Sequence, residues 1–298
     1  MSTLRLFKGH GTGNDFVIVP DADGSLALSA AQVRLLCDRR RGVGGDGLLR
    51  VVRVALDDEA RELAARTPFD ARHDAAPEWF MDYRNADGSV AEMCGNGMRV
   101  FAQYLADSGL AGDAFPVLTR GGIVGVRRAA AGGPDRAPRW TVAMGVPQVL
   151  DGPPIVRIGH EQWASIAALM IPNPHVVVHL PDAAAVHALD LTAPPEVSPV
   201  LPHGQNVEFV ASTGPRRLIM RVFERGVGET QSCGTGICAA AVAMAALQDS
   251  PPGEQRWHVD VPGGSCEVAL LPDGGVELTG PAVIVAELSL DTRQLSAC

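Results

Sequence analysis

The pattern of hydrophobic and polar positions contains one segment that differs from the rest of the chain. Residues 224–236 form a polar turn with four glycines, and residues 237–247 are eleven apolar residues without interruption. An apolar run with no polar face predicts a helix that is enclosed on all sides. Residues 218–223, before the turn, have the composition of a strand. We therefore expect strand, turn and buried helix in this order.

The same order occurs a second time in the first half of the chain. Residues 79–83 resemble a strand, residues 85–97 a glycine-containing turn, and residues 98–105 have the apolar spacing of a helix. Cys94 lies nine positions after Asn85, and Cys233 lies nine positions after Glu224. The two segments indicate an internal duplication in which each copy presents one thiol at the start of a helix.

The helix starts give these two cysteines a chemical context. The first N–H groups of a helix have no partner within it, and the helix dipole is positive there. Such a place binds a carboxylate and lowers the pKa of a thiol. A single cysteine is most often a small buried side chain, and Cys37 is assigned to the core in this way. Packing alone gives no reason for a thiol at both helix starts, so we assign Cys94 and Cys233 to chemistry.

Strands dominate the rest of the chain. They are expected at residues 4–7, 16–19, 48–54, 115–119, 123–128, 140–144, 176–180, 207–210, 216–223, 256–261, 266–271, 276–278 and 283–290. Residues 8–15 are expected to form a loop whose three glycines let the backbone approach a ligand. Their spacing matches neither a dinucleotide fingerprint nor a P-loop, so a nucleotide is not implied.

A few segments suggest other elements. Ser29 is expected to cap a helix that continues to Arg41, and Gly109 to end the helix after Cys94. Residues 57–77 resemble a surface insertion with one short helix, and residues 147–154 a proline-rich loop. Pro172 and Pro174 are expected to hold Asn173 in an extended conformation, which suits a side chain directed at a ligand.

The duplication predicts two similar domains. We expect an α/β (α+β) fold in which a sheet wraps around a central helix, built twice, with residues 1–134 in the N-terminal domain and residues 135–298 in the C-terminal domain. The last strand is allowed to return to the N-terminal domain. Residues 129–138, with two glycines and two prolines, are the expected linker.

Composition excludes several classes of protein. The net charge of −9 argues against a nucleic acid or an anionic membrane surface as partner. The longest apolar run is 11 residues, far short of the ~20 that span a bilayer. The chain starts without a secretory signal, so we expect a cytoplasmic protein with reduced thiols. The chain contains no Cys-x-x-Cys pair, which would have indicated zinc, so we expect no metal.

Two opposed thiols suggest a reaction. One thiolate removes a proton from a carbon while the opposite thiol donates a proton to the other face, which inverts the carbon. If that carbon carries a carboxylate, the two helix starts stabilise the charge that develops on its oxygens. Pyridoxal phosphate requires a lysine, and Lys8, outside both repeats, is the chain's one lysine. The sequence therefore favours a route without a cofactor.

Six motifs spread over both halves resemble the diaminopimelate epimerase family. They are residues 7–16 (FKGHGTGNDF), 85–89 (NADGS), 94–97 (CGNG), 173–175 (NPH), 206–207 (NV) and 224–236 (ERGVGETQSCGTG). The resemblance implies a two-lobed fold with the active site in the cleft. It also implies interconversion of LL- and meso-diaminopimelate, without cofactor or metal, in lysine and peptidoglycan precursor biosynthesis.

The resemblance also implies roles for individual residues. Cys94 and Cys233 match the two acid/base cysteines, and Glu224 and His175 match positions that orient the substrate and assist the thiols. A half-buried structural histidine is the alternative for His175. The other matching positions fall into two groups: Gly95, Asn96, Gly234 and Thr235 would hold the reacting carboxylate, and Asn14, Asn85, Asn173, Asn206 and Arg225 would bind the distal amino-acid end. We also expect a homodimer.

Three positions differ from the family pattern. Gly47 stands where many relatives have glutamine, Pro172 replaces a common glycine, and Gly9 occupies a common methionine position. Three other functions stay open. They are a related two-thiol racemase or isomerase of another small acid, a hydrolase or transferase with a Cys-His nucleophile, and an amino-acid-binding protein without catalysis.

Overall fold

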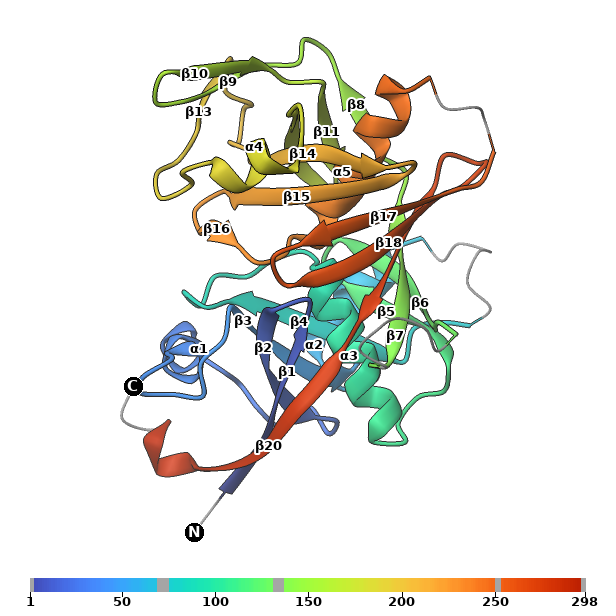
Figure 1. Cartoon of the computed structure of the whole chain (residues 1–298). Helices are drawn as coiled ribbons and strands as arrows, with labels where there is room; N and C mark the ends of the chain where they lie inside the picture. Colours follow the sequence, from blue (N-terminus) through green and yellow to red (C-terminus); the bar gives the residue numbers. More distant parts are fainter. Residues whose placement is uncertain (1–2, 69–74, 131–136, 250–252, 296–298) are drawn as a thin grey trace. The chain divides into compact units, whose positions relative to one another are not determined.

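The computed structural model describes residues 3–68, 75–130, 137–249 and 253–295, and they form two compact units (Figure 1). Unit 1 comprises Met1–Val142 and Pro281–Cys298, and unit 2 comprises Ala143–Gly280. Parts of two expected segments, residues 69–74 of the insertion and residues 131–136 of the linker, lie outside the described residues. No helix among the described residues is long and apolar enough to cross a membrane.

Unit 1 is built on one sheet, in which the described residues form eight strands. Its strands are β1 (Thr3–Gly11), β2 (Asn14–Asp21), β3 (Gly47–Arg53), β4 (Trp79–Asn85), β5 (Ala114–Thr119), β6 (Gly122–Arg128), β7 (Arg139–Gly145, which runs on into unit 2) and β20 (Val283–Asp291). Their order in space is β20-β1-β2-β3-β4-β5-β6-β7. The pairs β2/β3 and β4/β5 are parallel, and the others are antiparallel.

Helices cover both faces of this sheet. Helix α3 (Gly95–Asp107) packs against strands β1, β2, β3, β4, β6 and β20, and it is buried from Gly95 to Leu105. On the other face, α1 (Ala30–Cys37) and α2 (Asp58–Arg66) cover separate apolar clusters. Side chains alternate accordingly: Val17 packs in the α1 cluster, whereas Phe16 lies next to Gly97 of α3. A short 3₁₀ turn, η1 (Val54–Leu56), leads into α2.

Unit 2 contains a second sheet around a second enclosed helix. Its strands are β8 (Gln148–Leu150), β11 (Ala167–Ile171), β12 (Asn173–His179), β14 (Asn206–Gly214), β15 (Arg217–Glu224), β17 (Gln255–Val261), β18 (Gly264–Leu270) and β19 (Val276–Pro281), with β16 (Gly228–Thr230) paired to the end of β15. The order is β8-β11-β12-β14-β15-β17-β18-β19, and β12/β14 and β15/β17 are the parallel pairs. Helix α5 (Gly234–Leu247) packs on this sheet.

Smaller elements complete the two units. In unit 2, β9 (Ile155–Ile158), β10 (Glu161–Ala164) and β13 (Glu196–Ser198) form a three-stranded sheet, and α4 (Ala183–Ala188) packs on β14 and β15. Near the end of the chain, unit 1 has a 3₁₀ turn, η2 (Thr292–Gln294). The sequence pattern predicted neither the three-stranded sheet nor α4.

The two sheets share one topology. Read along either sheet, successive pairs are antiparallel, antiparallel, parallel, antiparallel, parallel, antiparallel and antiparallel. The enclosed helix follows the fifth strand in each order, β4 in unit 1 and β15 in unit 2. The expected duplication of a sheet wrapped around a central helix is therefore confirmed.

The expected loop at residues 8–15 is wrong. β1 continues to Gly11, β2 starts at Asn14, and the hairpin turns on Thr12 and Gly13, both with positive φ (51° and 79°). Gly9 and Gly11 both lie close against neighbouring atoms. A Cβ at Gly9 would lie 2.8 Å from Val100 Cγ1 of α3, so a larger residue would push β1 off the helix.

The expected end of the first helix is also wrong. Ser29 is the N-cap as predicted, with Gln32 completing a capping box, but α1 ends at Cys37 rather than at Arg41. The Asp38 side chain accepts hydrogen bonds from the backbone N–H groups of Arg40 and Arg41, both at 2.8 Å, which turns the chain out of the helix. The short helix expected in the insertion is α2, and the expected loop at residues 147–154 contains β8.

Candidate active site

Cys94 is placed by the start of α3. It is the N-cap residue, with an extended backbone (φ −142°, ψ 118°), and its sulfur accepts a hydrogen bond from the Gly97 N–H at 3.4 Å. Gly95 and Asn96, which form the first turn of the helix, are buried. The thiol therefore lies at the positive end of an enclosed helix, as the sequence predicted.

Asn14 lies beside Cys94 because β2 starts next to the first turn of α3. The Cys94 thiol donates to Asn14 Oδ1 at 3.8 Å, and Asn96 Nδ2 donates to the same oxygen at 3.3 Å. Asn14 Nδ2 donates to Asp46 Oδ2 at 2.8 Å. Both ends of the Asn14 amide are therefore held, and Asp46 is a residue that the sequence analysis missed.

Asp46 belongs to a charged cluster under the hairpin. Its Oδ1 accepts from Arg39 Nη2 at 2.7 Å, and Arg39 also binds both oxygens of Asp15. Burial acts to raise the pKa of Asp15, but Arg39 and Lys8 outweigh it and hold that pKa well below its usual range. Lys8 is paired with Asp15 and donates to the Gly44 carbonyl, so the chain's one lysine serves this cluster.

Asn85 is the last residue of β4. Its Oδ1 accepts from Tyr83 Oη at 3.0 Å, and its Nδ2 donates to Ser89 Oγ at 3.0 Å. Gly47 makes room for Tyr83, since a Cβ there would lie 2.7 Å from Tyr83 Cε2. Tyr83, which the sequence analysis also missed, thus occupies the space that a longer side chain at position 47 would need.

In unit 2, Cys233 is the N-cap residue of α5 and is 6% exposed. Its sulfur lies 3.4 Å from Thr235 Oγ1, in the first turn of the helix that begins at Gly234. Burial raises the pKa of the Cys233 thiol well above its usual value, and the carboxylates of Glu224 and Glu208 raise it further. The expectation that the helix start lowers the pKa is therefore wrong for Cys233, because desolvation and two acidic neighbours outweigh the hydrogen bonds from Thr235 and the Gly236 N–H at the helix start.

Glu224 ends β15 and faces the same thiol. Burial raises the pKa of its carboxyl, against the opposing effect of hydrogen bonds from the Thr230 hydroxyl and the Cys233 thiol. Thr230 lies on β16, which pairs back onto β15. The short β15–β16 hairpin therefore holds this carboxyl beside Cys233.

His175 is fully buried, with 0% exposure, rather than half-buried. Its Nδ1 lies 2.7 Å from Glu208 Oε1, and its Nε2 lies 3.0 Å from Asn173 Oδ1. Asn173 and His175 belong to β12, and Glu208 belongs to the parallel neighbour β14. Glu208 is a third residue that the sequence analysis missed. Its signal was a single acidic residue between the apolar residues Val207 and Phe209 of a predicted strand.

Asn206 and Arg225 are joined through the backbone. Asn206, opposite His175 in the β12/β14 ladder, accepts a hydrogen bond from the Arg225 N–H at 2.9 Å. The Arg225 side chain is exposed and donates to the His203 carbonyl. Unit 2 therefore contains eight of the predicted residues, on or directly next to β12, β14, β15 and α5: Asn173, His175, Asn206, Glu224, Arg225, Cys233, Gly234 and Thr235.

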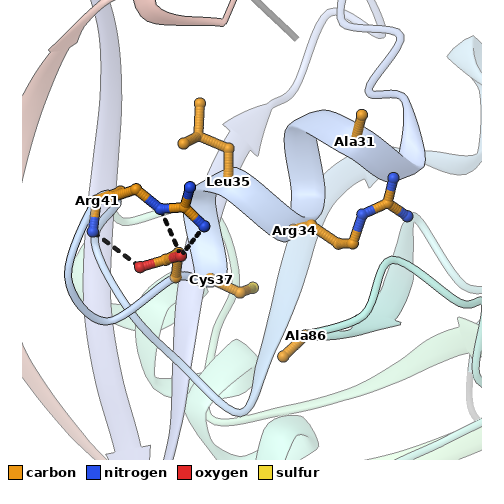
Figure 2. A pocket seen from close by; sticks show the side chains of 7 residues that line it. Ala31, Arg34, Leu35, Cys37, Arg41 and Ala86 are labelled. Atoms are coloured by element: carbon orange, nitrogen blue, oxygen red, sulfur yellow. Dashed lines mark hydrogen bonds and ion pairs between the residues drawn. The ribbon is translucent and has the colours of Figure 1, made fainter.

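Two further observations concern possible metal ligands and a hollow outside the predicted site. Among the described residues, no group of three or more His, Cys, Asp or Glu side chains is arranged to hold a metal ion, and the five described cysteines are free thiols. A hollow of about 500 Å³ beside α1 is lined by residues that include Arg34, Cys37 and Arg41, none of them a predicted site residue (Figure 2). Burial raises the pKa of Cys37 to about 12, which agrees with its assignment to the core.

Known proteins resemble this chain over almost its full length. The sequence model of the family described as "Diaminopimelate epimerase" matches residues 6–150 and 167–285. The diaminopimelate epimerase of Streptomyces coelicolor is 50% identical, over 99% of this chain and 98% of the relative. That of Thermobifida fusca is also 50% identical, over 95% and 97%.

Solved structures share the fold at low sequence identity. A phenazine biosynthesis protein of the PhzF family from Bacillus anthracis superposes with a TM-score of 0.67 at 16% identity, over 98% of this chain and all of the other. A probable proline racemase from Agrobacterium radiobacter gives a TM-score of 0.63 at 14% identity, over 97% and 94%. The family match in both units, together with relatives half identical over nearly their whole length, shows that this chain belongs to the diaminopimelate epimerase family.

Proposed function

We propose that this diaminopimelate epimerase interconverts LL- and meso-diaminopimelate with Cys94 and Cys233 as its two acid/base groups. The observation that carries the proposal is the equivalent position of the two thiols. Each is the N-cap residue of the enclosed helix that follows the fifth strand of its sheet. A reaction that removes a proton from one face of a carbon and delivers one to the other needs such a pair.

Each half of the site supplies one proton-transfer group and part of the carboxylate binding. In one direction a Cys94 thiolate takes the Cα proton and the Cys233 thiol gives its proton to the opposite face. In the other direction the roles exchange. The N–H groups at the start of each helix, those of Gly95, Asn96, Gly234 and Thr235, stabilise the charge that develops on the α-carboxylate.

The resting state of Cys233 follows from its surroundings. Burial, Glu224 and Glu208 all favour the neutral thiol, which suits Cys233 as the proton donor in the direction in which the Cys94 thiolate is the base. When Cys233 has given up its proton, the neighbouring carboxyl of Glu224, whose pKa is raised by burial, can return a proton to the thiolate.

The distal amino-acid end of the substrate is assigned to the asparagines and Arg225. The exposed guanidinium of Arg225 can fork a carboxylate, and Asn14, Asn85, Asn173 and Asn206 offer amides to an ammonium and a carboxylate. A second amino-acid head favours diaminopimelate over the smaller acids of related racemases. The hydrogen bonds of His175 run to Glu208 and Asn173, and Cys233 contacts Thr235, which does not favour a Cys233–His175 nucleophile.

The test is proton exchange at Cα. Reduced protein is incubated with LL-diaminopimelate in deuterated water, and deuterium and stereochemistry are followed for the wild type, Cys94→Ala and Cys233→Ala. Deuterated meso product from the wild type, and loss of epimerisation in each variant, is the expected result. Epimerisation that survives in either variant would refute the two-thiol mechanism.

A homodimer and a cytoplasmic location are further proposals. The homodimer is tested by sedimentation equilibrium of the purified protein, for which a monomer at micromolar concentration is the contrary result. The location is tested by fractionating cells that produce the protein, for which recovery outside the cytoplasm is the contrary result.

A further inference from the structure

Glu208 is a buried acidic residue whose contact with His175 has no role in the two-thiol reaction as described above. It lies on β14 with 0% exposure, and its Oε1 is 2.7 Å from His175 Nδ1. Its other oxygen, Oε2, is buried without a hydrogen-bond partner among the described residues. Burying a carboxylate with one oxygen unpaired costs free energy, so its presence calls for a reason.

The start of α5 is shaped around this carboxylate. A Cβ at Gly236 would lie 2.5 Å from Glu208 Oε1 and 3.1 Å from its Cδ. Glycine is therefore required at this point of the first helical turn, two residues after the helix begins. The positive end of the helix dipole lies next to Oε1.

A purely structural role explains the pair poorly. Strands β12 and β14 are already joined by a ladder that runs from His175 opposite Asn206 to His179 opposite Val210. Buried ion pairs seldom add net stability compared with apolar side chains of the same size. A leucine at position 208 would fill the space without the cost of desolvation.

An orienting role explains the contacts directly. A carboxylate that accepts the Nδ1–H of an imidazole fixes its tautomer and its ring orientation. With Nδ1 held by Glu208, Nε2 of His175 is kept against Asn173, one of the proposed substrate-binding residues. The same carboxylate is one of two that act on Cys233.

We propose that Glu208 is a positioning residue of the reaction, which accepts the Nδ1–H of His175 and so holds the imidazole beside Asn173. Its carboxylate also acts, together with Glu224, on the buried Cys233 thiol. This inference rests on the proposed two-thiol function. The titratable groups around Cys233 are Glu208 on β14, Glu224 on β15 and, facing Glu224, His175 on β12. On α5 itself, Thr235 contributes a hydroxyl.

The test compares two substitutions that separate charge from hydrogen bonding. Glu208→Gln removes the charge and keeps an oxygen that can accept the Nδ1–H, whereas Glu208→Leu removes both. Glu196→Gln is the matched control, because it removes one exposed carboxylate from the same unit. The measurements are kcat and KM, the alkylation of Cys233 by iodoacetamide as a function of pH, and the NMR signal of the His175 Nδ1 proton. His175→Gln assigns that signal.

In Glu208→Leu we expect kcat to fall about 10- to 100-fold, the range for removal of a carboxylate that orients a metal-binding histidine, with KM nearly unchanged and the Nδ1 signal lost. Glu208→Gln keeps the signal but moves the alkylation midpoint of Cys233 to lower pH. The control Glu196→Gln is expected to change neither the Nδ1 signal of His175 nor the alkylation midpoint of Cys233. A Glu208→Leu enzyme with kcat within about twofold of the wild type would overturn the positioning role. An unchanged Cys233 midpoint in Glu208→Gln would overturn the electrostatic role.

The near-isosteric Glu208→Gln keeps the proposal testable if Glu208→Leu does not fold. Loss of the Nδ1 signal in Glu208→Gln, with the fold intact, would then overturn the orientation by hydrogen bonding. The alkylation and NMR measurements need no turnover. If the wild type shows no Cα exchange, the two-thiol function fails, while these two readouts still decide whether Glu208 holds His175 and acts on Cys233.

Discussion

Asp46→Asn tests whether the Asn14 amide is held in place by the cluster under the hairpin. Asp46 accepts hydrogen bonds from Asn14 Nδ2 at 2.8 Å and the Asp15 N–H at 3.2 Å through one oxygen, and from Arg39 Nη2 at 2.7 Å through the other. An asparagine has one oxygen and one NH₂ group. If its oxygen faces Asn14, its NH₂ meets the guanidinium, and if its oxygen faces Arg39, its NH₂ meets the NH₂ of Asn14.

The size of the effect follows from the lost hydrogen bond. Hydrogen bonds to a charged group are worth about 1.5–3 kcal/mol. If the Asn14 amide flips to avoid the clash, its NH₂ turns toward Asn96 Nδ2, which now donates to Asn14 Oδ1 at 3.3 Å. In either case the Asn14 amide, which we assign to binding the distal end of the substrate, is no longer held in its present orientation. At 1.4 kcal/mol per factor of ten, kcat/KM is expected to fall about 10- to 100-fold, chiefly through KM.

The assay is deuterium incorporation at Cα over a range of diaminopimelate concentrations. Asp23→Asn is the control, since Asp23 is exposed and its carboxylate accepts from Ser25 Oγ at 3.0 Å, within its own loop. The control is expected to match the wild type. If Asp46→Asn retains kcat/KM within about twofold of the wild type, with a native circular dichroism spectrum, the reasoning about Asn14 is refuted.

Three further predictions concern single side chains. Glu224→Gln is expected to abolish epimerisation without lowering Tm. Because burial raises the pKa of this carboxyl, the folded state binds its proton more tightly than the unfolded chain does. The stabilisation that protonated Glu224 contributes is therefore lost as pH rises above the ordinary glutamate range. If Tm of the wild type and of Glu224→Gln changed with pH in parallel, this reasoning would be contradicted. Alkylation of Cys233 in the wild type is expected to need a higher pH than alkylation of an ordinary cysteine. A midpoint at or below the ordinary value would count against the effects of burial and of Glu224 on the pKa of this thiol. Tyr83→Phe, which removes the hydroxyl that donates to Asn85, is expected to lower kcat/KM about twofold to tenfold with little change in Tm, and an unchanged kcat/KM would remove Tyr83 from the site.

The enclosed helices were predictable because burial on all sides leaves its mark in the sequence. Residues 237–247 carry no polar face, and the structure places them in α5, which runs from Gly234 to Leu247. The positions of Cys94 and Cys233 as N-cap residues could be predicted because glycines follow each cysteine and the chain then changes to the apolar spacing of a helix. Local pattern therefore located both thiols without knowledge of the sheets.

The hairpin at the start of the chain was not predictable in the same way. Gly9 and Gly11 lack the side chains by which strands are recognised, and Thr12 adopts a positive φ that is unusual for a β-branched residue. The reason for glycine at these positions lies in α3, more than eighty residues later, which packs against the bare strand. A contact so distant in sequence leaves no periodic signal near residue 9.

The partners of the site residues were missed for a related reason. Glu208 and His175 are 33 residues apart, and they meet because β12 and β14 pair in parallel, which the hydrophobic pattern does not specify. Asp46 looked like an ordinary turn residue, since Asp is common in turns. To predict the pKa of Cys233, one needs the positions of two carboxyls on neighbouring strands. The helix start alone therefore suggested the wrong direction for the pKa shift.

The return of β20 to the edge of unit 1 has a consequence for synthesis on the ribosome. β20 pairs with β1 from Thr3 opposite Asp291 to His10 opposite Val283, so this edge of β1 stays unpaired until β20 has been made. Unit 2, a continuous segment from Ala143 to Gly280, has all its strands before β20 appears. We therefore expect unit 2 to complete its sheet before unit 1 does, with the edge of β1 exposed in the nascent chain until β20 has been synthesised.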